Sequence, residues 1–297
     1  MNCSIPNFFI IGGPKCGTTA LSAYLKENPQ VFFCEPKEPH YFNDDYLDRG
    51  VITEADYLRL FEGRKEQHRA IGEGSVQYLR SESAVKNILK FNPEAKFILM
   101  LRNPVEVAYS YHSQAVISHG ENVTDFRKAW NLRGERRVGK KLPHRKKERK
   151  VFVYSDIAKF GEQLDRLFSC VNKSNVKIIF FEDFKNNTLA TYKDTLQFLG
   201  VDYDGKIDFP VINQSKKYRF MLFERFRNNI VYFKEKYNIQ IKTGLLSYFR
   251  RRNVKVIPRK KLSIEFENEL KEYFLSDILK IEAMTGRDLS HWKKNIN

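Results

Sequence analysis

The chain has 297 residues, of which 42% are hydrophobic and 30% are charged; this suits one large α/β domain or two small ones and excludes disorder by composition. Its 52 Lys and Arg residues outnumber its 36 Asp and Glu residues, so the net charge is +16. Such a charge favours anionic partners without choosing among a nucleotide, an acidic glycan, a nucleic acid and an anionic membrane surface.

Cysteine usage and hydropathy bound the environment of the protein. The four cysteines (Cys3, Cys16, Cys34 and Cys170) form no Cys-x-x-Cys pair, and no histidine cluster has metal-ligand spacing, so we expect free thiols in a reducing compartment and no zinc site. No apolar run approaches the roughly 18 residues of a membrane span, and the N-terminus lacks a signal-peptide pattern. If the sequence is the full product, we expect a soluble, cytoplasmic protein.

The first predicted elements are a strand, a glycine-rich loop and a helix. Residues 8–11 are an apolar run of strand length, and residues 18–27 carry apolar side chains at helical spacing. Gly12 and Gly17 bracket the loop between them. Because such a loop presents backbone N–H groups and a helix N-terminus to an anion, the stretch predicts a phosphate-binding site.

The spacing in this loop differs from that of the usual ATP or GTP loop, G-x-x-x-x-G-K-[ST]. Gly12 and Gly17 have the right separation, and Thr19 occupies the hydroxyl position. The lysine position holds Thr18, and the lysine stands inside the loop as Lys15. The stretch therefore predicts a phosphate loop of another kind; the alternative is a glycine-rich turn with an exposed lysine.

An irregular stretch follows the next predicted strand, residues 31–33. Two prolines in residues 34–42 forbid continued sheet or helix. Glu38 and His40 therefore lie just past the carboxyl end of a strand, where open α/β sheets bind ligands. Glu38 is a candidate general base with His40 as its helper; the alternative is a solvated carboxylate beside a packed histidine.

The clearest buried strand, residues 96–101, ends in Arg102, and Pro104 opens a helix to about residue 117. A cation at this edge suits a second phosphate better than a metal, and Ser110 could reach the same anion from the helix. The alternative for Arg102 is a surface ion pair. The intervening segments predict a helix over 44–63, a short strand or turn over 70–73 and a helix over 81–89.

The second half of the chain alternates helix and strand around two basic regions. Residues 133–150 form a charge run without an apolar face, typical of a solvated loop. Helices are predicted over 157–170, 189–199, 221–236 and 263–284, and a strand over 176–181 ends in Glu182 and Asp183. These two acids leave open a kinase that binds magnesium, and the basic, aromatic segment 220–260 leaves open a nucleic-acid or membrane-binding protein.

Taken together, these motifs resemble the PAPS-dependent sulfotransferases, in particular bacterial members of the glycan or heparan-sulfate branch. These enzymes move a sulfuryl group from 3′-phosphoadenosine 5′-phosphosulfate (PAPS) to a hydroxyl or amine. Residues 14–19 are similar to the family's 5′-phosphosulfate loop, residues 101–104 with Ser110 to its 3′-phosphate element, and residues 38–42 to its Glu-x-His-Phe-Phe segment. Residues 182–183, 198–200 and 285–292 extend the resemblance over nearly the whole chain.

The resemblance implies one sulfotransferase domain over residues 1–297, with a P-loop-like, three-layer α/β/α fold around a mostly parallel sheet. It implies PAPS as donor, adenosine 3′,5′-bisphosphate (PAP) as product and no metal. Glu38 would be the base, with Lys15 and His40 as further catalytic residues. The donor would contact Lys15, Cys16, Gly17, Thr18, Thr19, Arg102 and Ser110, with Lys216, Lys217 and Arg219 standing in weakly for the family's Lys-Gly-Arg loop.

The sequence departs from the family at one further point. Heparan-type enzymes often carry a second lysine shortly after a Gly/Val-Glu pair, whereas Glu73 is followed here by Gly74 and Ser75. If Glu38 were not the base, Glu73 and His112 would be the next candidates.

The acceptor is expected to be a saccharide, a glycolipid or another hydroxylated small molecule. Residues 133–150 and 220–260 would be the elements on the acceptor side. Peripheral membrane contact fits the charge, nucleic acid is not expected, and the oligomeric state is not indicated. A P-loop kinase and a basic nucleic-acid or membrane-binding protein remain the alternatives.

Overall fold

The computed structural model describes residues 5–47, 50–51, 53–118, 120–143, 148–212, 216–218, 254–256 and 260–293. A five-stranded sheet in the order β2-β3-β1-β4-β5 forms its centre. The strands are β1 Phe8–Ile10, β2 Val31–Phe33, β3 Ala70–Gly74, β4 Lys96–Leu101 and β5 Val176–Phe180. All four pairings in this sheet are parallel, so the predicted α/β fold with a parallel central sheet is confirmed.

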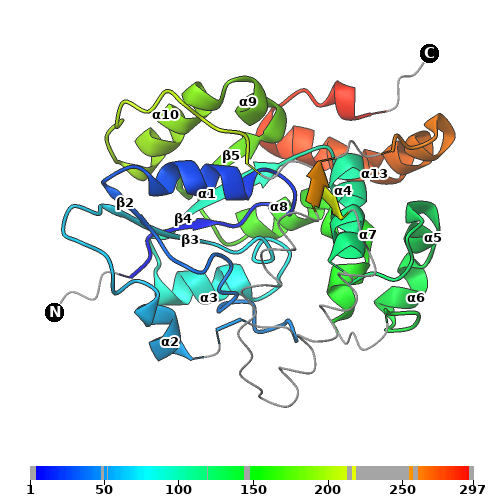
Figure 1. The fold of residues 1–297 in the computed structure, drawn as a ribbon, viewed down its shortest axis with the longest axis horizontal. Coiled ribbons are helices and arrows are strands. Elements are labelled where there is room, and N and C mark those ends of the chain that lie inside the picture. The colour runs from blue at the N-terminus through cyan, green and yellow to red at the C-terminus, as the bar shows by residue number, and fades with distance from the viewer. Residues whose placement is uncertain are drawn as a thin grey trace.

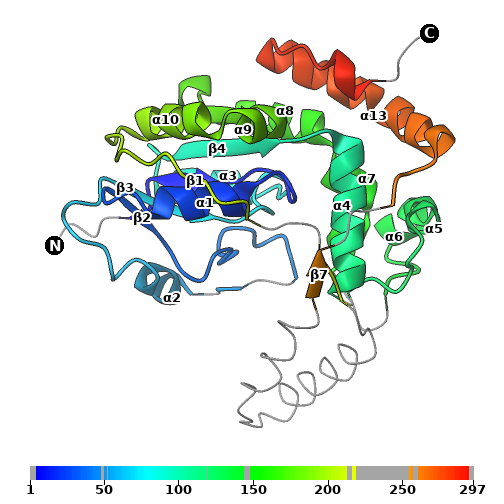
Figure 2. The same ribbon diagram turned by 45° about the horizontal axis from the view of Figure 1, so that its top comes forward.

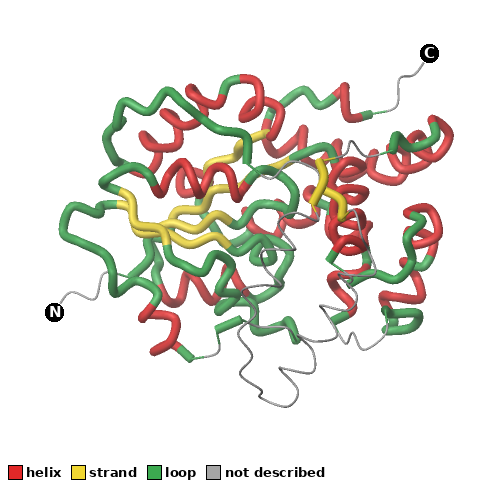
Figure 3. The backbone as a smooth tube through the Cα atoms, viewed as in Figure 1, coloured by secondary structure: helices red, strands yellow, loops and turns green. Residues whose placement is uncertain are grey.

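Helices cover both faces of the sheet and give the molecule three layers. Figures 1 and 2 show helices on both sides of the strands; α1 packs against α10, and residues of α3 and α8 line one small cavity. The bounds of the helices in these layers are α1 Thr18–Lys26, α3 Ala84–Phe91, α8 Phe160–Phe168, α9 Phe181–Asn186 and α10 Thr188–Leu199. Figure 3 shows the strands side by side in the centre with helices on either side.

Burial on both faces explains why the strands are continuous apolar runs. Every residue of β1 is fully buried, as is every residue of β4 after Lys96. The two strands pair with Phe9 opposite Phe97, and their rings stack with centroids 6.0 Å apart. The core therefore runs through the middle of the sheet, and β1 and β4 carry their following loops to one edge.

A second group of helices lies beyond the carboxyl ends of the strands. Figure 2 shows α4, Pro104–Ile117, standing across this edge. Its bounds are those predicted, because Pro104 is pre-set for the first turn and the Asn103 side chain accepts a hydrogen bond from Val105 N–H. The remaining elements are α2 Glu54–Arg59, α5 Phe126–Asn131, α6 Arg133–Arg137, α7 Tyr154–Ile157, α13 Ile264–Thr285, the antiparallel pair β6 Lys216–Tyr218 and β7 Val254–Val256, and the 3₁₀ turns η1 Arg149–Phe152, η2 Lys173–Asn175 and η3 Ser290–Trp292.

Three sequence predictions need correction. The helix expected over 44–63 is reduced to α2, which begins where Thr53 caps it. The helix expected over 157–170 is α8, Phe160–Phe168, which begins later than predicted, where the carboxylate of Asp277 accepts hydrogen bonds from Gly161 N–H (2.9 Å) and Glu162 N–H (3.0 Å). The charge run is not a solvated loop throughout, since its first five residues form α6. The helix predicted over 221–236 lies outside the described residues.

Candidate active site

The ends of four parallel strands bring the predicted site residues to one edge of the sheet. Ile10 at the end of β1 pairs with Gly74 of β3 on one side and with Ile98 of β4 on the other, and β2 follows beside β3. β3 and β2 lie on one side of β1, and β4 and β5 lie on the other. The strand order therefore reverses at β1, and the carboxyl edge of the sheet at such a point is the usual position of a ligand.

The glycine-rich loop after β1 lies flat on β4. A Cβ at Gly12 would stand 2.3 Å from the backbone nitrogen of Met100, so only glycine fits there. Gly17 adopts φ 93° at the start of α1. No side chain caps α1 and no acid lies in its first turn, whereas Ser263 caps α13. The dipole at the start of α1 is therefore not offset by a carboxylate, which favours an anion there.

Cys16 contributes only its backbone to this loop. Its thiol is fully buried and lies 3.6 Å from the carbonyl oxygen of Pro14. Burial raises the pKa of the Cys16 thiol, which outweighs the opposing charge of Arg102. The predicted donor contact at Cys16 can therefore involve its amide but not its sulfur.

Arg102, which follows β4, contacts the glycine-rich loop directly. Its Nη1 donates to the carbonyl oxygen of Lys15 at 3.1 Å, and its guanidinium lies 4.4 Å from the centre of the Phe181 ring. The same side chain pairs with Glu106, to which Nε donates at 2.7 Å. Arg102 and Lys15 thus belong to one cationic region, in which Glu106 occupies part of the guanidinium.

Glu38 and His40 lie together in the loop after β2. Glu38 Oε2 is 3.3 Å from His40 Nε2; the His40 side chain is 14% exposed and the Glu38 side chain is 35% exposed. Burial would raise the pKa of Glu38, but the hydrogen bond from His40 and the charge of Lys37 outweigh it, so the pKa lies below its ordinary value. Glu38 is therefore ionised at neutral pH and able to accept a proton.

Backbone conformation marks the same residues. Four non-glycine residues of the described part have positive φ: Lys15 (66°), Glu38 (64°), His40 (52°) and Lys141 (52°). Such conformations are costly and persist where the surroundings impose them, which is frequent at functional sites. Three of the four are the predicted catalytic residues.

A buried carboxyl on β3 holds the Glu38 loop in this conformation. Glu73 is fully buried and accepts hydrogen bonds from Tyr57 Oη (3.2 Å) and Ser75 Oγ (3.1 Å). Ser75 Oγ in turn accepts from His40 N–H at 3.2 Å, and Tyr78 Oη accepts from the next backbone N–H, that of Tyr41, at 3.0 Å.

Burial raises the pKa of Glu73 to about 8, although the Tyr78, Ser75 and Tyr57 hydroxyls lower it in part. Glu73 is consequently neutral at pH 7 and closed to solvent, so it positions the loop and is a poor alternative base. His112, the other alternative, is buried too, with Nε2 2.8 Å from the carbonyl oxygen of Val123.

Lys37 is a site residue that the sequence analysis missed. Its Nζ lies 3.1 Å from Thr18 Oγ1 and 3.3 Å from Thr19 Oγ1, and 3.6 Å from Glu38 Oε1. The sequence signal that could have found Lys37 was its position directly before the candidate base, in the loop that follows β2.

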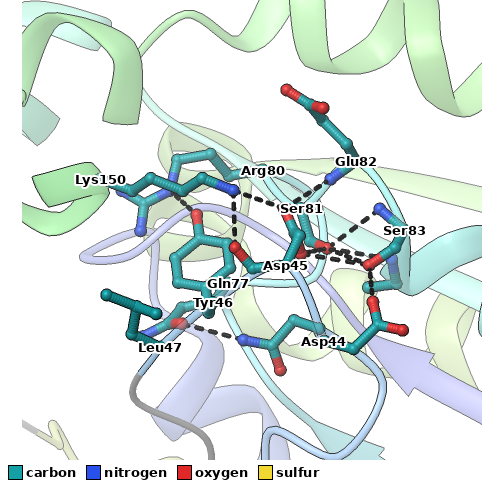
Figure 4. A network of polar contacts seen from close by, with 12 residues as sticks. Asp44, Asp45, Tyr46, Leu47, Gln77, Arg80, Ser81, Glu82, Ser83 and Lys150 are labelled. Carbon is teal, nitrogen blue, oxygen red and sulfur yellow. Dashed lines mark hydrogen bonds and ion pairs between the residues drawn. The ribbon is translucent and has the colours of Figure 1, made fainter. Parts of the chain in front are cut away.

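A polar network fastens the segment that follows the Glu38 loop (Figure 4). Lys150 Nζ donates to Asp45 Oδ2 at 2.7 Å, Asp45 also accepts from Glu82 N–H at 3.2 Å, and Arg80 Nε donates to Tyr46 Oη at 2.6 Å. Glu148 accepts from the backbone N–H of Leu47 at 2.8 Å. The end of the charge run is thus attached to the segment that follows the Glu38 loop, at Asp45 and Leu47.

The two acids that suggested a magnesium site are used elsewhere. Glu182 accepts a hydrogen bond from Trp292 Nε1 at 2.5 Å, and Asp183 accepts from Arg287 Nη2 at 2.7 Å. Both therefore hold the C-terminal segment against β5 and α9. Within the residues described, no group of three or more His, Cys, Asp and Glu side chains is placed to hold a metal ion.

The other residues predicted to contact the donor remain predictions. Ser110 is buried within α4, and its place at the 3′-phosphate stays a prediction. The backbones of Lys216 and Lys217 pair with β7, but their side chains and the whole of Arg219 lie outside the described residues, as does most of segment 220–260.

An uncapped helix behind a glycine loop, at the edge of a parallel sheet, defines a phosphate-binding α/β protein of the P-loop type. A family model described as "Sulfotransferase domain" matches residues 6–284, so the chain belongs to the sulfotransferase family. The family predicted from the motifs is thereby confirmed.

Individual relatives agree with this membership. A solved sulfotransferase from Alicyclobacillus acidocaldarius is 26% identical, with a TM-score of 0.74 over 98% of this chain and 100% of that one. Membrane-associated sulfotransferase kil1 of Dictyostelium discoideum is 36% identical over 109 residues, which are 36% of this chain and 23% of that protein. Carbohydrate sulfotransferase 15 of Mus musculus is 33% identical over 150 residues, covering 36% and 26% of the two chains.

The match to these curated relatives spans about a quarter of their length. Among the helices described here, none has the length and apolar character needed to cross a membrane.

Proposed function

We propose that this protein transfers a sulfuryl group from PAPS to a hydroxyl or amine of an acceptor, with a saccharide or glycolipid as the acceptor class. The observation that carries the proposal is the meeting of three parts at one sheet edge. These are the uncapped loop after β1, Arg102 bound to the loop carbonyl of Lys15, and the ionised Glu38 beside His40.

Donor binding would use the two cationic parts of the site. The first-turn amides of α1 and the hydroxyls of Thr18 and Thr19 suit a 5′-phosphate. Arg102 suits a 3′-phosphate, which would compete with Glu106 for the guanidinium. A nucleotide without a 3′-phosphate could not replace Glu106 at the Arg102 guanidinium. This is the proposed basis for preferring PAPS to ATP.

In the transfer itself, the acceptor oxygen attacks sulfur as the bond between sulfur and the bridging phosphate oxygen breaks. The bond's electron pair leaves with PAP, and the acceptor proton passes to Glu38. Lys15 would stabilise the charge that develops on the bridging oxygen. His40, 3.3 Å from Glu38, would orient the carboxylate. Protein cations and backbone dipoles supply the positive charge in this scheme, so we propose that it runs without a metal.

Two features support an acidic saccharide as the acceptor. One matched relative is named a carbohydrate sulfotransferase and another a heparan sulfate N-deacetylase/N-sulfotransferase. The net charge of +16 attracts polyanions, and Lys150 attaches the end of the basic run to Asp45, in the segment that follows the Glu38 loop.

Titration of PAP into the pure protein by calorimetry tests the donor, and incubation with ³⁵S-labelled PAPS and an acceptor panel tests transfer. We expect saturable heat with PAP, label in a saccharide or glycolipid fraction, and the same transfer in the presence of EDTA. Absence of heat with PAP would overturn the proposal. Phosphate transfer that requires ATP and magnesium would establish a kinase, and salt-dependent RNA or vesicle binding without PAP binding would establish a binding protein.

A further inference from the structure

The Lys37 side chain crosses from the loop after β2 to the phosphate loop. Its ammonium lies within hydrogen-bond distance of the hydroxyls of Thr18 (3.1 Å) and Thr19 (3.3 Å), the first two residues of α1. Its stem passes Gly74 at the end of β3, where an added Cβ would lie 3.2 Å from Lys37 Cε. The absence of a side chain at position 74 thus leaves room for this lysine.

The hydrogen-bond chemistry of this contact directs both hydroxyls toward an anion. An ammonium has three donors and no acceptor, so each threonine oxygen must accept from Lys37. The hydroxyl protons are then left to be donated to another group. At the uncapped N-terminus of α1, phosphate oxygens are the acceptors that this arrangement suits.

The ion pair of Lys37 with Glu38 is longer than the contacts of Lys37 with the two threonines. Its Nζ is 3.6 Å from Glu38 Oε1, farther than either threonine oxygen. The ammonium therefore lies between the phosphate loop and the candidate base. In a group transfer, the group that moves passes between these two parts.

We propose that Lys37 is a second catalytic lysine, whose ammonium binds the non-bridging oxygens of the sulfuryl group while that group moves from PAPS to the acceptor. The inference rests on the proposed function. Lys37 stays protonated throughout: the acceptor oxygen–sulfur bond forms, the bond from sulfur to the phosphate oxygen breaks, PAP keeps the electron pair and Glu38 takes the proton.

The burial of the Lys37 side chain is consistent with a role in binding the sulfuryl group. The Lys37 side chain is 20% exposed, and burial lowers its pKa although the Glu38 charge raises it in part. A cation that has already lost most of its water interacts more strongly with an incoming anion. Binding of the doubly phosphorylated donor would add negative charge nearby and keep the amine protonated.

The test compares Lys37→Met and Lys37→Arg with the wild type and with Lys26→Met. Lys26 ends α1 and pairs with the exposed Glu35, away from the threonine hydroxyls. Two measurements need no acceptor: PAP affinity by calorimetry, and release of ³⁵S-sulfate from labelled PAPS into water. Thermal melting checks that each variant is folded.

We expect Lys37→Met to release sulfate about 10²–10³-fold more slowly, the range for removal of one preorganised charge stabiliser, with PAP affinity lowered about tenfold or less, because PAP lacks the sulfuryl group. Lys37→Arg should recover part of the rate, and Lys26→Met should match the wild type. Sulfate release by Lys37→Met within threefold of wild type would overturn the inference. So would a loss of PAP affinity as large as the loss of rate, because Lys37 would then bind phosphate alone.

The two proposals fail differently. A wild-type protein that does not bind PAP sinks the proposed function and this inference with it. A wild type that binds PAP and releases sulfate, beside a Lys37→Met variant that does both equally well, removes only the role of Lys37.

Discussion

The low pKa of Glu38 is due to its neighbours and opposes the effect of burial. It lies between Lys37 on one oxygen and His40 on the other, and these two contacts reverse the effect of burial on its pKa. Its left-handed backbone is held by the hydrogen bond from its own N–H to the carbonyl oxygen of Gly74 at 3.1 Å. The carboxylate is thus presented in one orientation before any substrate arrives.

Under the proposed mechanism, replacing Glu38 with Gln removes the base and leaves the donor site intact. We expect transfer to fall by about 10²–10⁴-fold, the usual contribution of a general base, while PAP affinity measured by calorimetry stays within a fewfold of wild type. Glu35→Gln is the matched control, since its carboxylate is exposed and pairs with Lys26. Nearly full turnover by Glu38→Gln would show that another group takes the proton.

Glu73 makes stability depend on pH in a predictable direction. The folded pKa is about 8 and the ordinary value is 4.5. Between these values the unfolded chain loses the proton and the folded chain keeps it, so the stability contribution is complete below pH 4.5 and is lost as pH rises to about 8.

Glu73→Gln cannot titrate and serves as the reference. Urea unfolding of both proteins from pH 4.5 to 8.5 should show wild type losing stability relative to the variant as pH rises. The change should reach a few kcal/mol, at about 1.4 kcal/mol for each unit between the two pKa values. A difference that stays constant across this range would show that Glu73 is ionised in the folded protein.

At the scale of elements, α6 carries two adjacent arginines in contrasting surroundings. Arg136 is fully buried, and its Nη1 donates to Glu121 Oε2 at 2.7 Å and its Nη2 to Oε1 at 3.0 Å. Arg137 pairs with Asp156, and about 40% of its side chain is exposed. One helix thus contains a buried and an exposed ion pair side by side.

The two arginines should therefore differ sharply in their effect on stability. Arg136→Met leaves the Glu121 carboxylate buried without its partner, which should cost about 3–5 kcal/mol. Arg137→Met removes a solvent-screened pair, worth about 0–1 kcal/mol. Urea unfolding of both variants measures the difference; equal losses would mean that burial of the Arg136 pair does not control its contribution.

Element by element, the sequence was informative where the controlling contacts are local. The bounds of α4 followed from Asn103 and Pro104, and the end of α10 from Gly200, which adopts φ 75°. The start of α8 depends on Asp277, more than a hundred residues away, and no local pattern announces it.

The same distinction holds within the candidate site. The loop of Lys15 and the strand end at Arg102 were predicted because each follows its own strand, and parallel strands bring their carboxyl ends together. The contact of Lys37 with Thr18 and the hydrogen bond of Glu73 with Ser75, which in turn holds His40, depend on how two loops fold back over that edge. Burial of Arg136 likewise required knowing that Glu121 lies opposite.

At the scale of the whole molecule, the proposed donor site predicts a shift in thermal stability when ligand binds. A ligand at about a hundred times its dissociation constant stabilises the folded state by about 2.7 kcal/mol. At about 2.1 cal/mol/K of unfolding entropy for each of the 297 residues, we expect PAP to raise the melting temperature by about 4 °C. Adenosine 5′-monophosphate is the matched comparison, because it lacks the group proposed for Arg102.

Melting curves with each nucleotide at equal concentration check this expectation. A larger shift with PAP than with adenosine 5′-monophosphate supports two separate anion contacts. Equal shifts would leave the 3′-phosphate without a partner on the protein and would remove Arg102 from the donor site.

The placement of Cys16 bears on how the protein tolerates oxidants. A thiol inside a nucleotide loop is ordinarily a weak point, because alkylation or peroxide there would block the ligand. Here the sulfur points into the core, and its raised pKa keeps it protonated, whereas the reactive form is the thiolate. The loop can therefore keep a cysteine at its centre without making catalysis redox-sensitive at that position.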